Sequence, residues 1–134
     1  MSEHTLVIIK PDVVEAGNAG KVLARYEEAG LTIESMELRE ITGEFADQHY
    51  AEHLERDFYP PLREFMTSGP LIPLILSGED AIARVRALNG ATDPKKAEAG
   101  TIRADFGESG PRNAVHASDS PESAAREIAL WFNR

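Results

Sequence analysis

The stretch Thr5-Leu6-Val7-Ile8-Ile9-Lys10-Pro11-Asp12 decides the fold that we predict for this 134-residue chain. Its first five residues form a short apolar and β-branched run, which is typical of a buried strand. Lys10-Pro11-Asp12 then predicts a turn. Charged side chains therefore stand at the C-terminal end of a strand whose own residues belong to the core.

A helix and a second strand follow this strand. Residues 21–29 place Val22, Leu23 and Tyr26 on one apolar face, and Gly30 is a typical residue just beyond a helix end. Residues 31–39 alternate between apolar and polar side chains, which predicts a half-buried strand. The N-terminal third is therefore expected to be β-α-β.

The middle of the chain predicts two short helices and then a strand-helix unit. Thr42 can cap a helix that runs to about His53, and Pro60-Pro61 can open another that ends near Met66. Residues 71–76 are a further apolar run, and Asp80 can cap a helix that stops at Gly90.

Residues 91–112 show no sustained periodicity, and an unstructured loop of this length is usually functional or mobile. Asn113 to His116 is a brief strand candidate, with Ser120 as N-cap and Pro121 as first residue of a last helix. The order contains the β-α-β-β-α-β pattern. We therefore predict an α/β (α+β) fold, with a ferredoxin-like four-stranded antiparallel sheet covered by helices, an inserted helical hairpin and a long active-site loop. One domain over residues 1–134 is expected.

Composition excludes several classes of function. The chain has 14 basic and 23 acidic residues, a net charge of −9, and this field repels nucleic acid and anionic membranes. It has no cysteine, which excludes disulfides, thiolate nucleophiles and cysteine-zinc sites. The polar start and the absence of a long apolar run favour a cytoplasmic location.

His116 is the first candidate for chemistry. It lies at the end of a strand beside an N-capped helix, where anions bind, and an imidazole can act as a nucleophile or transfer protons near neutral pH. Taken alone, such a histidine is more often a structural hydrogen-bonding residue. Glu127 lies two helical turns after Ser120 and is a candidate partner, although polar residues on a terminal helix are usually only solvated.

Four cationic residues stand at element ends or in loops: Lys10, Arg86, Arg103 and Arg112. Each alone is most simply a surface charge. Together near His116 they would offset several negative charges, which suits a triphosphate better than a long polymer.

Two patterns are set aside. His49 and His53 have the i, i+4 spacing of a helical metal pair, but a third ligand is not evident, so an exposed helix face is the simpler interpretation. Gly17-Asn18-Ala19-Gly20 matches a short pattern of single-strand RNA readers, yet the pattern is common by chance and the net charge opposes it.

Several segments together resemble the nucleoside diphosphate kinase family from Thr5 to Phe132. The most specific is Asn-x-x-His-x-Ser-Asp-Ser at residues 113–120, preceded by Gly-Thr-Ile-Arg at residues 100–103. The others are residues 9–12, 56–58, 90–94 and 104–106.

The resemblance implies a ping-pong transfer of the γ-phosphoryl of a nucleoside triphosphate, such as ATP or GTP, to a nucleoside diphosphate through a phosphohistidine at His116. Magnesium (Mg2+) is expected to bridge the phosphates, with no metal site of protein ligands alone. The family also implies a homo-oligomer built on dimers. In the family pattern, Glu127 and Ser118 orient the histidine, and Lys10 contacts the phosphoryl group and the 3′-hydroxyl with Tyr50 close by. Arg86, Thr92 and Arg103 bind the α and β phosphates. Asn113 bonds the sugar, and Phe58 and Leu62 contact the base.

The chain departs from the family pattern near this site. Ala117 stands where the family usually has glycine, and strain is expected there if the backbone is left-handed. Asp57 replaces a proline, and Gly110 replaces an apolar residue beside the base. The alternative function is a catalytically weak ferredoxin-like nucleotide-binding or regulatory module. Single-strand nucleic-acid binding on the sheet is a third possibility, which the charge opposes.

Overall fold

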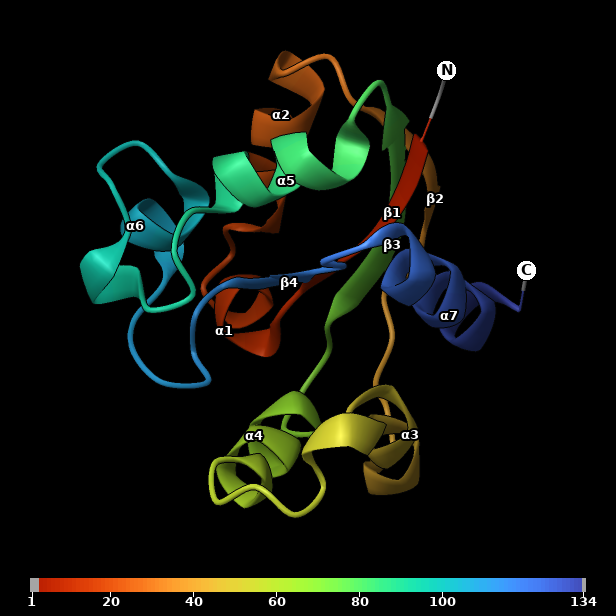
Figure 1. Ribbon diagram of the computed structural model, residues 1–134. Coiled ribbons are helices and arrows are strands. Elements are labelled where there is room, and N and C mark those ends of the chain that lie inside the picture. The colour runs from red at the N-terminus through yellow and green to blue at the C-terminus, as the bar shows by residue number, and fades with distance from the viewer. Residues whose placement is uncertain (1–2, 134) are drawn as a thin grey trace.

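Four strands form one antiparallel sheet in the order β2-β3-β1-β4 in the computed structural model, which describes residues 3–133 (Figure 1). The elements are β1 (Glu3–Ile9), α1 (Pro11–Glu15), α2 (Ala19–Glu28), β2 (Thr32–Met36), α3 (Gly43–His49), the 3-10 turn η1 (Ala51–His53), α4 (Tyr59–Met66), β3 (Ile72–Gly78), α5 (Ala81–Asn89), the 3-10 turn η2 (Pro94–Lys96), α6 (Ile102–Phe106), β4 (Val115–Ala117) and α7 (Pro121–Phe132).

Strand β1 is buried on both faces because its successive side chains enter two separate cores. Val7 and Ile9 pack with residues of α2 and α5. Leu6 and Ile8 pack with residues of α3, α4 and α7 on the other face. All four side chains are fully buried, which explains why the strand is a continuous apolar run instead of an alternating one.

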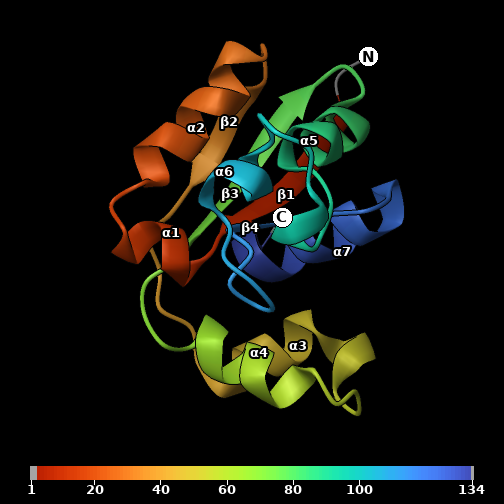
Figure 2. The same cartoon turned by 90° about the vertical axis from the view of Figure 1, so that its left-hand side faces the viewer.

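Helices cover both faces of the sheet accordingly. Figure 1 shows α2 beside α5 on one side, and Figure 2 shows α3 and α4 together as a separate pair between β2 and β3 in the chain. The predicted ferredoxin-like α+β fold with an inserted helical hairpin is confirmed. No helix within residues 3–133 has the length and apolar character needed to cross a membrane.

Two helix caps form as the sequence predicts. The Thr42 side chain accepts the Phe45 N–H at the start of α3. Ser120 accepts the Ser123 N–H, and Ser123 accepts the Ser120 N–H in return, which closes a capping box at the start of α7. Both caps hold the beginnings of helices that border the site described below.

The cap predicted for α5 is wrong. Asp80 has φ 52° and its side chain makes no cap hydrogen bond. The Glu3 carboxylate accepts the Ile82 N–H at 2.9 Å instead. A residue 79 positions away thus satisfies the helix start, and such a long-range cap cannot be seen in the local sequence.

Short helices stand where a turn and an unstructured loop were predicted. Pro11 opens α1, and the segment 91–112 contains η2 and α6. Thr101 caps α6 by accepting the Ala104 N–H. Helices α1 and α6 have only five residues each, which is too short for a helical period to emerge from the sequence.

Candidate active site

An open cavity of about 860 Å³ lies against β4 and the start of α7 and is bordered by the helical hairpin and the segment 90–113. Its lining contains all the residues that the family resemblance assigns to the site except Ser118. Those that line it are Lys10, Tyr50, Phe58, Leu62, Arg86, Thr92, Arg103, Asn113, His116 and Glu127.

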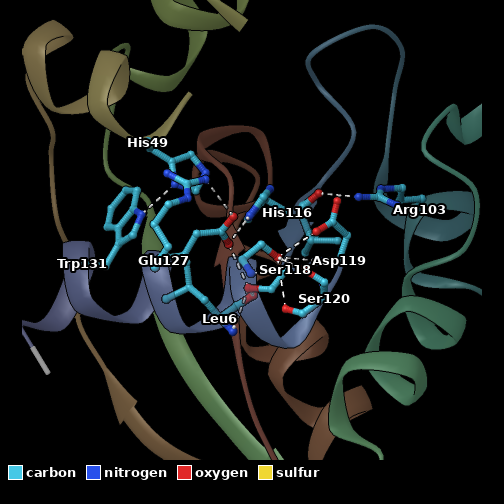
Figure 3. A network of polar contacts seen from close by, with 12 residues as sticks. Leu6, His49, Arg103, His116, Ser118, Asp119, Ser120, Glu127 and Trp131 are labelled. Atoms are coloured by element: carbon cyan, nitrogen blue, oxygen red, sulfur yellow. Dashed lines mark hydrogen bonds and ion pairs between the residues drawn. The ribbon is translucent and has the colours of Figure 1, made fainter. Parts of the chain in front are cut away.

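His116 is held by α7 through one ring nitrogen. It lies in β4 opposite Ile8, and its Nε2 is 2.9 Å from a Glu127 carboxylate oxygen (Figure 3). Ser118 donates to the same oxygen at 2.8 Å. The Glu127 side chain is only 6% exposed. Its carboxylate accepts a hydrogen bond from Nε2 and so favours the His116 tautomer that has its proton on Nε2. The unprotonated Nδ1 is then the nucleophilic atom of the ring.

Lys10 follows β1 directly and is buried in the cavity wall. Its Nζ donates to the Asn113 side-chain oxygen at 2.8 Å and to the Pro111 carbonyl at 3.4 Å. Burial and then the charge of Arg103 lower the pKa of Lys10 to about 8, against the opposing effect of Asp12. The amine is therefore a cation that a bound anion would stabilise.

Arg103 is fixed to three backbone carbonyl groups. It donates from Nε, Nη1 and Nη2 to the carbonyls of Asn113, Gly90 and Val115, at 3.3, 2.8 and 2.8 Å. Burial lowers its pKa from the usual value. Within residues 3–133 these bonds leave two of its five N–H groups for a ligand. Thus Arg103 both ties the loop to β4 and presents charge to the cavity.

The other predicted cations differ from one another in position. Arg86 is exposed and lines the cavity. Arg112 instead forms an ion pair with Glu108 at 2.7 Å and is absent from the lining. Asn113 donates from Nδ2 to the Thr92 carbonyl at 3.0 Å, so the loop carrying Thr92 is joined to the segment that precedes β4.

Asp119 and Phe58 give the cavity wall two different surfaces. Ser123 donates to the Asp119 carboxylate at 2.7 Å and lowers its pKa, so an ionised oxygen group lines the wall beside Arg86. Phe58 is 49% exposed at the hairpin, whereas Leu62 beside it is buried. Gly110 also lines the cavity and offers no side chain there.

His49 is a site residue that sequence reasoning missed. The expectation of an exposed helix face is wrong, because His49 is 4% exposed. Trp131 donates from its indole N–H to His49 Nδ1 at 3.0 Å (Figure 3). The His49 ring packs edge-on to the His116 ring with centroids 4.7 Å apart. The helical hairpin and α7 come together only in the folded protein. The i, i+4 spacing of His49 and His53 within one helix therefore could not predict this contact.

His49, His116 and Glu127 place three potential metal-ligating atoms within 4.8 Å of one another. However, His49 Nδ1 accepts the Trp131 N–H, and burial followed by the charge of His116 holds the His49 pKa well below its usual value. A neutral ring that accepts at Nδ1 carries its proton on Nε2 and has no lone pair left for a metal. The cluster therefore supports His116 in two ways, through the hydrogen bond of Glu127 and through the edge-on packing of the His49 ring.

The condition for strain at Ala117, a left-handed backbone, is not met. Ala117 belongs to β4, and the only non-glycine residues with positive φ in residues 3–133 are Asp80, Ala114 and Asn133. The left-handed position of this segment is Ala114, with φ 75°, two residues before His116.

The fold and the site together define a ferredoxin-like protein with a histidine-centred cavity into which Lys10, Arg86 and Arg103 bring positive charge. The family model for nucleoside diphosphate kinase matches residues 3–134. A nucleoside diphosphate kinase of Nocardioides is 58% identical over 98% of this chain and 98% of its own length. One of Rhodococcus erythropolis is 59% identical over 98% of this chain and 96% of its own length. The chain belongs to the nucleoside diphosphate kinase family.

Solved structures agree. An Aquifex aeolicus nucleoside diphosphate kinase has a TM-score of 0.93 and 46% identity and covers 97% of this chain and 94% of its own. A halophilic relative from Halobacterium salinarum, in complex with CDP, has a TM-score of 0.96 and 40% identity over 100% of this chain and 90% of its own. The predicted enzyme class is confirmed over the alternative of a weak binding module.

We expect nucleotide binding to take up protons near pH 8. The pKa of Lys10 is about 8, so about half of its amines are neutral at that pH, and phosphates nearby raise the pKa. Binding of ADP should then take up to about half a proton per site. Calorimetry in buffers of different ionisation enthalpy measures this uptake. The Lys10→Met substitution removes the titrating amine. If this variant, saturated with ADP, still takes up as many protons as the parent, Lys10 is not the group that titrates.

Proposed function

We propose that His116 Nδ1 attacks the γ-phosphorus of a nucleoside triphosphate. The P–N bond forms as the bond to the β,γ-bridging oxygen breaks, and the nucleoside diphosphate leaves. A second nucleoside diphosphate then takes the phosphoryl group from the histidine. The observation that carries this proposal is the Nε2 contact with Glu127 at 2.9 Å, which holds the ring and leaves Nδ1 unprotonated.

The cations of the cavity are proposed to bind the phosphates. Lys10 would reach the transferred phosphoryl group and the 3′-hydroxyl. The Tyr50 hydroxyl, which is buried and has no hydrogen-bond partner among residues 3–133, lies in the same cavity. Arg86, Arg103 and Thr92 would hold the α and β phosphates. Phosphoryl transfer requires mainly in-line positioning and donors around the equatorial oxygens, and this set supplies both.

The sugar and the base are assigned to further residues of the same cavity. Asn113 would bond the sugar, and its side chain is already fixed by Lys10 and the Thr92 carbonyl. Phe58 would stack on the base, with Leu62 beneath it. ATP, GTP and other nucleotides are therefore the proposed substrates, and the Halobacterium salinarum relative with bound CDP supports a pyrimidine among them.

Magnesium is proposed as the cofactor. A divalent cation bound with the nucleotide would neutralise charge that develops on the phosphates during γ-phosphoryl transfer. Magnesium prefers oxygen ligands and usually binds through one or two carboxylates together with substrate phosphates. The ionised Asp119 carboxylate on the cavity wall fits that role.

A homo-oligomer built on C2 dimers is also proposed. Strand β2 is an edge of the sheet, and Met36 and Leu38 near its end are 48% and 67% exposed. Open edges with apolar side chains favour pairing with a second copy. Light scattering at micromolar concentration should give at least a dimer mass in low and in molar salt, whereas a monomer in both would contradict the proposal.

The family match over residues 3–134 supports one domain over 1–134; residues 1, 2 and 134 of that range lie outside the described part of the chain. One domain and a cytoplasmic location both stay predictions.

His116→Ala should abolish phosphate transfer and leave nucleotide binding largely intact, because the substitution removes the nucleophile and leaves the phosphate ligands. Incubation with ATP labelled at the γ position should give an acid-labile, alkali-stable phosphoenzyme in the parent and in the control variant, but not in His116→Ala. His4→Ala is the matched control, since His4 is exposed and lies outside the cavity. A transfer rate of His116→Ala within tenfold of the parent rate would refute the assignment of His116 as the nucleophile.

Glu127→Gln should lower the transfer rate less than His116→Ala does, because glutamine retains a hydrogen-bond acceptor for the ring.

Phe58→Ala should lower kcat/KM for GDP, CDP and dGDP alike and narrow a modest preference for purines. Stacking contributes about 1–3 kcal/mol per base and tolerates every base, because each has a π face. Leu54→Ala is the control, as Leu54 is 48% exposed on the same hairpin and outside the cavity lining. A thousandfold preference of the parent for one base would show that a polar base reader exists and would contradict this model.

A further inference from the structure

The segment that leads into β4 contains a strained turn. Ala114 has φ 75° and is fully buried. The Val115 N–H donates to the Asn113 carbonyl at 2.9 Å, which closes a three-residue γ-turn around Ala114. A γ-turn with this positive φ is rare and strained for a residue that has a Cβ atom. Surrounding structure must therefore hold Ala114 in place.

The segment that follows β1 supplies that hold from both sides. The Lys10 N–H donates to the Ala114 carbonyl at 2.9 Å. The Asp12 carboxylate accepts the Ala114 N–H through Oδ2 at 3.2 Å, across 102 residues of chain. Both polar groups of the strained residue are thus bound by residues 10–12.

Asp12 makes this contact at an energetic cost. It is 6% exposed, and its other oxygen, Oδ1, is buried with no hydrogen-bond partner among the described residues. Burial raises the pKa of this carboxyl, against the Ala114 N–H and the Lys10 charge. A buried carboxylate with one unpaired oxygen lowers the stability of the fold. We therefore look for a role at this position that an apolar side chain could not fill.

The turn determines where two site residues point. Asn113 lies immediately before it, and His116 is the second residue after it. Strand β4 has only three residues, paired with β1 from Val7 to Ile9, so few ladder hydrogen bonds fix its direction. A change of the turn at Ala114 would move His116 relative to Glu127 and Asn113 relative to Lys10.

We infer that Asp12 is a positioning residue for phosphoryl transfer: its carboxylate holds the left-handed turn at Ala114, and that turn directs His116 and Asn113 toward the phosphates. The inference rests on the proposed role of His116. The simpler structural role is stabilisation of α1, because Asp12 lies in the first turn of that helix. The two roles differ in whether the effect of Asp12 depends on Ala114.

A double-mutant cycle separates them. Glycine adopts positive φ without strain, so Ala114→Gly should remove the need for the hold. Asp12→Ala should lower the single-turnover rate of phosphoenzyme formation at saturating ATP by about 10²-fold, the scale expected when reacting groups are displaced by about 1 Å. ATP affinity should fall much less than the rate. In the Ala114→Gly background, the same Asp12→Ala change should lower the single-turnover rate by less than about tenfold. The difference between the two backgrounds measures the coupling between Asp12 and Ala114.

Asp12→Asn is the conservative variant, since its amide oxygen still accepts the Ala114 N–H, and it should restore the rate to within about fivefold of the parent. Thermal midpoints measured in parallel report stability separately from rate. Equal rate losses from Asp12→Ala in both backgrounds would overturn the inference and leave only the helix-stabilising role. If Asp12→Ala alone does not fold, the double variant decides: a folded, active double variant supports the inference, and a folded but inactive one overturns it.

Failure of the proposed function would look different. A phosphoenzyme that persists in His116→Ala refutes the nucleophile, whereas a missing coupling between Asp12 and Ala114 in an enzyme phosphorylated at His116 refutes only the positioning role.

Discussion

Burial of β1 on both faces is the constraint on which the rest of the structure depends. Val7 and Ile9 need cover on one side of the sheet and Leu6 and Ile8 on the other. Helices α2 and α5 cover only the first side, so the second needs the helical hairpin and α7. The hairpin is therefore part of the core, and it also carries Tyr50 and other residues over the cavity. One apolar strand thus accounts for both the layers and one wall of the site.

The cavity lining is less acidic than the chain as a whole, because four basic side chains there balance four acidic ones. The protein has a net charge of −9, yet Lys10, Arg86 and Arg103 face one cavity. Burial lowers the pKa of Lys10 and of Arg103, which means that water stabilises these cations poorly. A nucleotide brings the negative charge that water does not supply there, so its phosphates gain more from these cations than they would at the surface. The acidic exterior meanwhile disfavours long polyanions.

The sequence predicts the features that depend on local patterns and misses those that depend on distant contacts. The apolar runs, the Thr42 and Ser120 caps and the motif around His116 lie within a few residues, so strands, hairpin and family were predictable. Short helices such as α1 and α6 are too brief for a period to show. The Glu3 cap of α5 and the His49 contact with His116 join segments far apart in the chain. Strain was considered at Ala117, on the condition of a left-handed backbone, but the positive φ of this segment lies at Ala114.

The energetic costs of the fold gather around the cavity. Tyr50 and His53, which line it, and Asp12, which supports it, each have a buried polar atom without a partner; outside it the described residues add only Thr5 and Asn89. Unpaired polar groups and a strained residue lower stability wherever they occur. At a binding site, however, such groups are already oriented before the ligand arrives, and a ligand that completes their hydrogen bonds recovers the cost without reorganising the protein. Of the groups that weaken the free fold, Tyr50 and His53 line the cavity and are placed to meet a charged, hydrogen-bonding ligand, whereas Asp12 lies outside the lining. The hairpin that carries Tyr50 and His53 packs into the core on the α7 side of the sheet, and that packing fixes where these groups lie.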